Sequence, residues 1–337
     1  MFLPSRSSSA RRESLWASGC FLLFFTGFLV AMETRFPHWT DREYAARRDM
    51  ALQCHEENPE RPMLAVIGGS RVGTGFFPEE MGPLHDKSGQ QISVVNFSHL
   101  GAGPRMNLLQ LHRLLREGIT PTSIVVEIVP AHLCSEITTI ADLSLADVSI
   151  LRPHWNDKQL LINPAKARLK GLFRFRNGFL DTVAPDFSTS PPLHLSRYGG
   201  NPRWLESHPR ATTDKADLIR EIRWQFQERM LNWRIDPELD AAMRAILELC
   251  KERGIRASIA LFPESSEFRS WYAPGVEERI QRYFTGLCDE YALPFYDCRE
   301  WMDDGDFHDP HHMTPEGARR FSVKFGDIVL KNIASSP

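Results

Sequence analysis

The chain has 337 residues, of which 42% are hydrophobic and 25% are charged, values that are ordinary for a globular protein. Its net charge of −3 gives no reason to expect a nucleic-acid partner, because no long basic run follows Arg6, Arg11 and Arg12. The six cysteines include no CxxC pair, which argues against a zinc ribbon. The length fits one large domain, or a core with an insertion.

The N-terminal segment carries the first structural signal. Residues 14–32 have no charge and are rich in Phe and Leu, enough to span a hydrocarbon core of roughly 30 Å. Arginines precede this run and Glu33 follows it, so we expect a cytoplasmic tail at 1–13 and a signal anchor at 14–32. A cleaved signal peptide is the alternative, although residues 28–32 lack a good small-x-small cleavage site. Both interpretations export the rest of the chain to the periplasm or the cell exterior.

Residues 33–61 are polar and charged, and we interpret them as a juxtamembrane stalk with some helix. The remainder, 62–337, is predicted to form one domain. Short continuous apolar runs, typical of buried parallel strands, occur at 63–67, 92–97, 123–129, 257–262 and 294–297. Helical patterns follow them at 106–115, 241–253, 276–291 and 315–333. This alternation predicts an α/β fold whose parallel sheet is covered on both faces, with functional sites at the carboxyl ends of the strands.

Residues 134–235 break this rhythm, and a stretch of that length is too long for a simple loop. We expect a mostly helical insertion after the third strand, beside the mouth of the site. Its aromatic residues would form either a sugar-binding platform or part of a core, the more common use of aromatics at this density. These residues are Trp155, Phe173, Phe175 and Trp204.

Three polar side chains, distant in sequence, offer the parts of a nucleophilic site. Asp309 precedes His312 by three residues, just before a helix start at Thr314-Pro315. Ser70 stands at the end of the first apolar run. A serine needs a base to become a nucleophile, and the base needs an acid that fixes its tautomer.

Three blocks together resemble the SGNH (GDSL-like) hydrolases. Residues 68–71, Gly-Gly-Ser-Arg, resemble the first block of that family. Residues 95–103, Val-Asn-Phe-Ser-His-Leu-Gly-Ala-Gly, are similar to the second block, and 309–312, Asp-Pro-His-His, to the last. The resemblance covers roughly 63–133 and 250–330.

The resemblance implies a flavodoxin-like three-layer α/β/α core and a serine esterase mechanism. Ser70 would be the nucleophile, His312 its base and Asp309 the partner of that base. The backbone N–H groups of Ser70 and Gly101 would bind the oxyanion. No cofactor and no metal are implied.

The third block departs from the family pattern. The family has Gly-x-Asn-Asp after the third strand, and the asparagine side chain is an oxyanion donor. Here Ala131 stands at that position. Either His132 or a residue of the insertion supplies the missing hydrogen bond, or the activity is weakened or lost.

Other polar residues near these blocks are candidates for substrate contacts. Arg71 would bind an anion or an acyl carbonyl, or else form a structural salt bridge. Glu264, after the fourth strand, is placed where it would touch substrate, and His311 is expected to line the mouth. A metal at the histidine-rich stretch 308–312 is disfavoured, because catalytic zinc sites usually set their histidines at i and i+4 on a helix.

The sequence thus predicts a membrane-anchored serine esterase or O-acetyltransferase that acts on ester-linked acyl groups of cell-envelope glycans. It is similar in arrangement to membrane-anchored SGNH-like proteins of the envelope, including the alginate acetylation group. Its partners would be an acylated carbohydrate or small ester, the membrane, and an envelope acyltransferase. The alternatives are an inactive protein that binds a glycan or a partner, and a lipase or thioesterase.

Overall fold

The computed structural model describes residues 7–136, 143–155, 175–187, 193–207 and 213–335. The chain divides into two compact units. The first comprises Met1–Arg42, Ile140–Val148 and Lys158–Thr189. The second comprises Glu43–Thr139, Ser149–Asp157 and Ser190–Pro337 and contains the sheet.

The second unit is built on a six-stranded sheet in the order β2-β3-β1-β4-β5-β6. The strands are β1 (Met63–Ile67), β2 (Leu84–His85), β3 (Gln91–Asn96), β4 (Ser123–Glu127), β5 (Arg256–Leu261) and β6 (Phe295–Asp297). Only β2 pairs antiparallel within this sheet; the other neighbours are parallel. The predicted α/β fold with a parallel sheet is therefore confirmed, and the short edge strand β2 is an addition to it.

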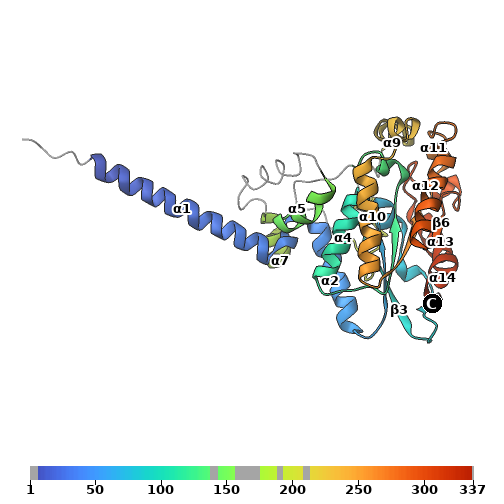
Figure 1. The fold of residues 1–337 in the computed structure, drawn as a ribbon, viewed down its shortest axis with the longest axis horizontal. Coiled ribbons are helices and arrows are strands. Elements are labelled where there is room, and N and C mark those ends of the chain that lie inside the picture. Colours follow the sequence, from blue (N-terminus) through green and yellow to red (C-terminus); the bar gives the residue numbers. More distant parts are fainter. Residues whose placement is uncertain (1–6, 137–142, 156–174, 188–192, 208–212, 336–337) are drawn as a thin grey trace, which may run out of the picture. The chain divides into compact units, whose positions relative to one another are not determined.

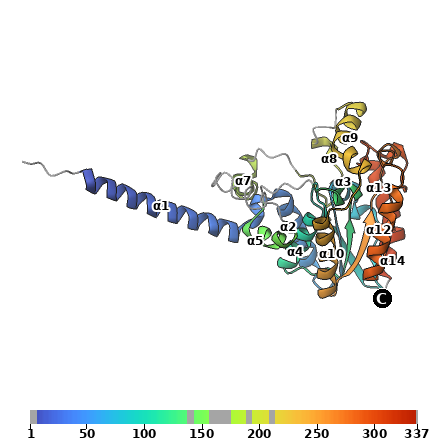
Figure 2. The same ribbon diagram turned by 45° about the horizontal axis from the view of Figure 1, so that its top comes forward.

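Side chains alternate between the two faces of the sheet because successive residues of a strand point to opposite sides. In β1, Ala65 and Ile67 join one hydrophobic core, whereas Leu64 and Val66 join the other. The first core is covered by α4 (Pro104–Arg116), α10 (Pro237–Glu252) and α12 (Val276–Tyr291). The second is covered by α3 (Ser70–Gly75), α13 (Pro315–Phe325), the π-helical turn η10 (Gly326–Leu330) and α14 (Lys331–Ala334). Figures 1 and 2 show the strands between α4 and α10 on one side and α13 and α14 on the other.

The segment expected to be a stalk contains α2 (Arg42–Glu57), and from Glu43 onward it belongs to the second unit. Tyr44, Met50 and Cys54 are buried in the first core. The buried guanidinium of Arg47 donates hydrogen bonds to the carbonyl oxygens of Asn96 and Gly199. A helix held in this way is part of the domain, which corrects the expected boundary at residue 62.

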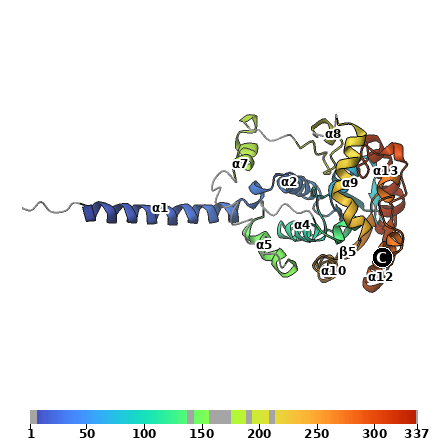
Figure 3. The ribbon, with the colours of Figure 1, turned by 90° about the horizontal axis from the view of Figure 1, so that it is seen from above.

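The region expected to be a helical insertion holds helices and turns in its described parts. They are α5 (Leu145–Leu151), η5 (Arg152–His154), α7 (Arg176–Val183), η7 (Pro185–Phe187), α8 (Trp204–Ser207) and α9 (Lys215–Leu231). The turn η3 (Pro130–Leu133) precedes them. Because α9 contacts η3, which follows β4, it lies at the carboxyl end of the sheet, as the view from above in Figure 3 shows.

In the first unit, α1 (Ser7–Arg35) is followed by the turn η1 (Pro37–Thr40). Within α1, the stretch Ala10–Arg35 is long and apolar enough to cross a membrane, and the most apolar part of that stretch is not buried. A signal sequence near an N-terminus meets the same criterion.

Candidate active site

The histidine and the carboxylate of the site lie on a tight loop before α13. Its ends are joined by a bridge between Phe307 and Met313, and the turn η9 (Asp304–Asp306) comes directly before the bridge. The turn η2 (Pro78–Glu80), far upstream in the sequence, contacts α13. Thr314 caps α13 by accepting a hydrogen bond from Gly317 N–H at 3.0 Å. Gly317 must lack a side chain, because a Cβ there would lie 2.4 Å from the carbonyl oxygen of Asp306. The predicted helix start thus fixes the loop rigidly.

Folding brings the three predicted side chains into one hydrogen-bonded chain. His312 Nε2 lies 2.8 Å from Ser70 Oγ, and His312 Nδ1 lies 2.8 Å from Asp309 Oδ2. The other carboxylate oxygen of Asp309 accepts the backbone N–H groups of His311 at 3.0 Å and His312 at 2.8 Å. Asp309 and His312 are buried, whereas Ser70 is half-buried.

The electrostatics of this loop fix the tautomer of the base. Burial alone would raise the pKa of Asp309, but its interactions with His312 and His311 outweigh burial and hold that pKa well below the usual range. The ionised carboxylate accepts the Nδ1 proton of His312. The lone pair of Nε2 then faces Ser70, as a general base requires.

The turn before Ser70 depends on two glycines and a buried glutamate. Gly69 N–H donates to Glu127 Oε2 at 3.1 Å, which ties the turn to the end of β4. A Cβ on Gly68 would lie 2.6 Å from the same oxygen, so only glycine leaves room for the carboxylate. Ser70 is the first residue of α3, and no side chain caps that helix.

Two backbone N–H groups, those of Ser70 and Gly101, were predicted to bind an oxyanion. Within the described part of the chain, no acceptor is found for the N–H groups of Ser70 and Gly101. Gly101 has φ +71°, a conformation that favours glycine, in a turn closed by Ala102 N–H to His99 O at 3.0 Å. His99 N–H also donates to Gly68 O at 2.9 Å, which holds the two turns together.

The third block supplies no side-chain donor at Ala131, which is fully buried in η3. His132 lies beside this position, and its Nδ1 is 3.1 Å from Ala102 O. Because a carbonyl only accepts, Nδ1 carries the proton and Nε2 has a lone pair. Burial, with a contribution from Arg229, lowers the pKa of His132 to about 3. The neutral ring therefore cannot replace the missing donor through Nε2.

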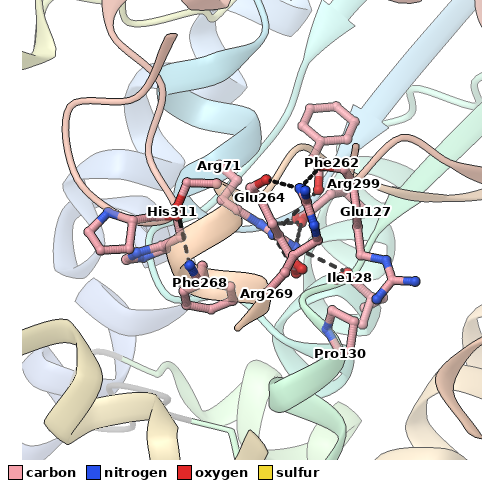
Figure 4. A network of polar contacts seen from close by, with 12 residues as sticks. Arg71, Glu127, Ile128, Pro130, Phe262, Glu264, Phe268, Arg269, Arg299 and His311 are labelled. Carbon is pink, nitrogen blue, oxygen red and sulfur yellow. Dashed lines mark hydrogen bonds and ion pairs between the residues drawn. The ribbon is translucent and has the colours of Figure 1, made fainter. Parts of the chain in front are cut away.

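Arg71 and Glu264 were expected near substrate, and the structure places both in a buried network beneath the site (Figure 4). Arg71 Nη2 lies 2.9 Å from Glu127 Oε1, and Arg71 Nη1 lies 3.1 Å from Glu264 Oε1. Its guanidinium also donates to the carbonyl oxygen of Ile128 at 3.4 Å. The salt-bridge interpretation of Arg71 is the one that fits, because a fully engaged, buried guanidinium has no free face for an anion.

The same network reaches the loop that holds the base. Glu264 lies next to Ser265, whose hydroxyl donates to Pro310 O at 2.7 Å. Glu264 N–H donates to Arg299 O at 3.0 Å, and Arg299 pairs with Asp297 at the end of β6. One connected set of polar contacts therefore supports the turn of Ser70 on one side and the loop of His312 on the other.

His311 was expected to line the mouth, but its ring is buried between aromatic side chains. It lies 5.1 Å from the ring of Phe226 on α9 and 5.5 Å from that of Phe268 on α11 (Ser266–Arg269). Its Nδ1 is 3.3 Å from Asp309 Oδ1, and burial, with the neighbouring His312, lowers its pKa to about 4. The ligand atoms of Asp309, His311 and His312 lie within 4.8 Å of one another. Both oxygens of the Asp309 carboxylate already face partners in this loop, Oδ1 the backbone N–H groups of His311 and His312 and Oδ2 the ring of His312.

Two aromatic residues of the insertion, Trp155 and Trp204, pack against side chains of the second unit. Trp204 is buried with its ring 5.6 Å from His312 and 5.7 Å from His308, a contact that no local sequence signal indicates. Trp155 packs under the guanidinium of Arg105 at 4.5 Å. Phe175 belongs to the first unit, and Phe173 lies outside the described residues.

All six cysteines are described, and none is in a disulfide. Four of them are buried small residues: Cys54, Cys250, Cys288 and Cys298.

Comparisons with known proteins identify no family for the chain. No protein-family model matches it, and no curated protein matches it significantly. Among solved structures, it is similar to a protein from Bacteroides fragilis that is provisionally described as an acylhydrolase. The two share 12% identity and a TM-score of 0.38, over 84% of this chain and 96% of the other. An overlap of this extent does not establish a common fold.

Proposed function

We propose that the chain is a serine hydrolase or O-acyltransferase of the SGNH type. The observation that carries this proposal is the continuous chain Asp309–His312–Ser70, with two contacts of 2.8 Å. The sheet supports it as well. Its parallel strands, numbered along the chain without β2, stand in the order 2-1-3-4-5, which is the flavodoxin-like order.

In the proposed reaction, Ser70 Oγ attacks the carbonyl carbon of an ester while His312 Nε2 takes the hydroxyl proton. Asp309 keeps the ring oriented and stabilises the imidazolium that forms. The ester C–O bond then breaks, and His312 gives the proton to the departing alcohol oxygen. The acyl group is left on Ser70. Water or a sugar hydroxyl, deprotonated by His312, attacks that acyl group and releases it, which gives an esterase or an acyltransferase respectively.

The oxyanion would be bound by the backbone N–H groups of Ser70 and Gly101. A side-chain donor of the family is missing at Ala131, and one such donor is typically worth about 10²–10³ in turnover. We therefore expect slow turnover of unactivated esters and a preference for small acyl groups on good leaving groups.

The substrate class and the location are part of the same proposal. We infer an anchor in α1 with a cytoplasmic N-terminus, because basic residues precede the apolar stretch, and an exported catalytic domain. There the accessible esters would be acyl groups on envelope glycans. An envelope acyltransferase would be the partner that supplies or uses them.

A serine-directed fluorophosphonate probe tests the proposal on the full chain in detergent. Wild-type protein should be labelled, and Ser70→Ala should not. Ser88→Ala is the matched control, because Ser88 is exposed in the turn between β2 and β3 and bonds only within that turn, to Asp86. Absence of wild-type labelling would reject the enzymatic proposal. Hydrolysis of p-nitrophenyl esters would then separate an acetyl esterase from a lipase or thioesterase, which prefers long chains.

A second candidate is an inactive protein that binds a glycan or a partner. The absence of an oxyanion side chain at Ala131, with His132 unable to donate, favours it. This candidate predicts glycan binding that Ser70→Ala leaves intact, together with no covalent labelling of the wild type.

A further inference from the structure

An apolar groove lies at the end of α1, within the first unit. It has a volume of about 360 Å³ and is lined almost wholly by large hydrophobic side chains, with Arg176 as the charged exception. The hydrophobic lining residues are Phe28, Met32, Phe36, Trp39, Phe175 and Phe179. Two of them, Phe28 and Met32, belong to the last turns of the apolar stretch of α1.

The helix α7 forms one wall of this groove and is held in place by specific contacts. The ring of Trp39 stacks on Phe36 at 4.2 Å and meets the edge of Phe179 at 5.8 Å. Gly178 allows this approach, because a Cβ there would lie 2.4 Å from the carbonyl oxygen of Trp39. Arg42 and Asp181 form an ion pair across the same contact. The position of α7 against the end of α1 is thus a packed arrangement.

The exposed side chains of α7 and of the following turn η7 form a second apolar feature, which shares Phe179 with the groove. Phe179, Val183 and Phe187 are 44%, 60% and 74% exposed. Phe179 and Val183 are four residues apart and therefore lie on one face of α7, and Phe187 follows in the turn η7. Single exposed hydrophobic residues are normal, but a stripe that borders an apolar groove marks an interaction surface.

The groove lies at the end of α1, the helix whose apolar stretch is long enough to cross a bilayer, and the stripe borders the groove. A lipid that reaches Phe28 and Met32 on α1 also reaches the groove. Arg35 in the last turn of α1 and Arg176 in the groove are placed where their long side chains would reach the headgroup region. We propose that α7 and η7 lie in the membrane interface as an amphipathic anchor, and that a phospholipid acyl chain occupies the groove. This inference rests on the anchoring part of the proposed function.

Lipid photolabelling of the full chain tests this surface. The protein is reconstituted in vesicles of phosphatidylcholine and phosphatidylglycerol, with a fraction of the phosphatidylcholine carrying a diazirine on its acyl chain. After irradiation, labelled peptides are mapped by mass spectrometry. We expect label in α1 and in residues 175–187. In a Val183→Ser/Phe187→Ser variant, which changes only exposed side chains, most label in 175–187 should be lost while label in α1 stays.

Trp224 on α9 serves as the control, because it is 85% exposed and lies outside this surface. It should remain unlabelled, and Trp224→Ser should leave the label in 175–187 unchanged. Label in α1 without label in 175–187 would overturn the inference and leave the anchor standing. Label in neither segment would overturn both, and equal label at Trp224 would show that exposure alone governs the reaction.

Discussion

Replacing Arg71 by methionine should destabilise the protein severely while leaving most apolar contacts of that side chain in place. Arg71 is enclosed by Glu127 and Glu264, and all three side chains are buried. Methionine retains much of the side-chain length but carries no charge. The variant would leave two carboxylates close together without water and without their shared cation.

The size of the effect follows from the cost of uncompensated buried charge. Removing one partner of a buried ion pair typically costs about 3–5 kcal/mol, and here one guanidinium serves two carboxylates. Burial already raises the pKa of Glu264, so that group would take up a proton once Arg71 is lost. A carboxyl group whose pKa is higher in the folded than in the unfolded state lowers the unfolding free energy at neutral pH. That lost free energy is regained as the pH falls through the folded-state pKa, because the folded protein then takes up the proton. The deficit of Arg71→Met should therefore shrink at acidic pH.

Urea unfolding of the full chain in detergent, followed by tryptophan fluorescence, measures this deficit. The triple variant Arg71→Met/Glu127→Gln/Glu264→Gln is the matched control, because it removes all three charges together. It should recover much of the lost unfolding free energy. A loss below about 1 kcal/mol in Arg71→Met, typical of a surface pair, would refute the reasoning. So would a triple variant no more stable than the single one.

Three further predictions concern the site. Asp309→Asn should keep the fold but lower the rate of fluorophosphonate labelling by up to about 10⁴, because an amide does not hold His312 in the required tautomer. Gly101→Ala should lower the unfolding free energy by about 1–2 kcal/mol, because alanine is strained at the φ of +71° found there. It should also slow fluorophosphonate labelling relative to the wild type, because the turn that carries the Gly101 N–H group would shift. His132 and His311 are buried with pKa values of about 3 and about 4, below the ordinary value near 6.5. The unfolded chain therefore binds more protons between these values, and each histidine should lower stability by about 1.4 kcal/mol per pH unit as pH falls from 6 to 4. Urea titrations of wild type and His311→Phe test this, since the variant should lose one histidine's share of the slope and an unchanged slope would contradict it.

The parallel strands could be predicted closely from sequence because their signal is local. A buried strand in such a sheet is a short apolar run that ends at glycine, proline or a polar residue. Strand β1 and helix α12 have the predicted limits, 63–67 and 276–291. Strand β2 was missed, because its two residues, Leu84 and His85, are too few to form a pattern.

The segment 33–61 could not be assigned correctly from its polarity. The buried face of α2 includes Arg47, whose charge makes the segment look solvated. Its hydrogen-bond partners, Asn96 O and Gly199 O, are 49 and 152 residues away, so no local pattern shows that the charge is satisfied inside the domain.

The proximity of the triad residues was predictable, whereas the surroundings of the site were not. The spacing of Asp309 and His312 before a helix start is a short-range signal. By contrast, Arg71 is paired with Glu264, 193 residues away, and His311 is enclosed by aromatic residues from two separate helices. Whether a charged side chain near a motif faces solvent or a buried partner depends on such distant contacts.

Ser70 and His312 are 242 positions apart, so the serine leaves the ribosome long before the histidine that would activate it. A growing chain can form β1 and present the serine hydroxyl long before the imidazole exists. Reactivity would begin only once α13 has been synthesised and docked. If the proposed export and serine chemistry hold, the chain would stay unreactive during translocation, and labelling of its serine would report completed folding.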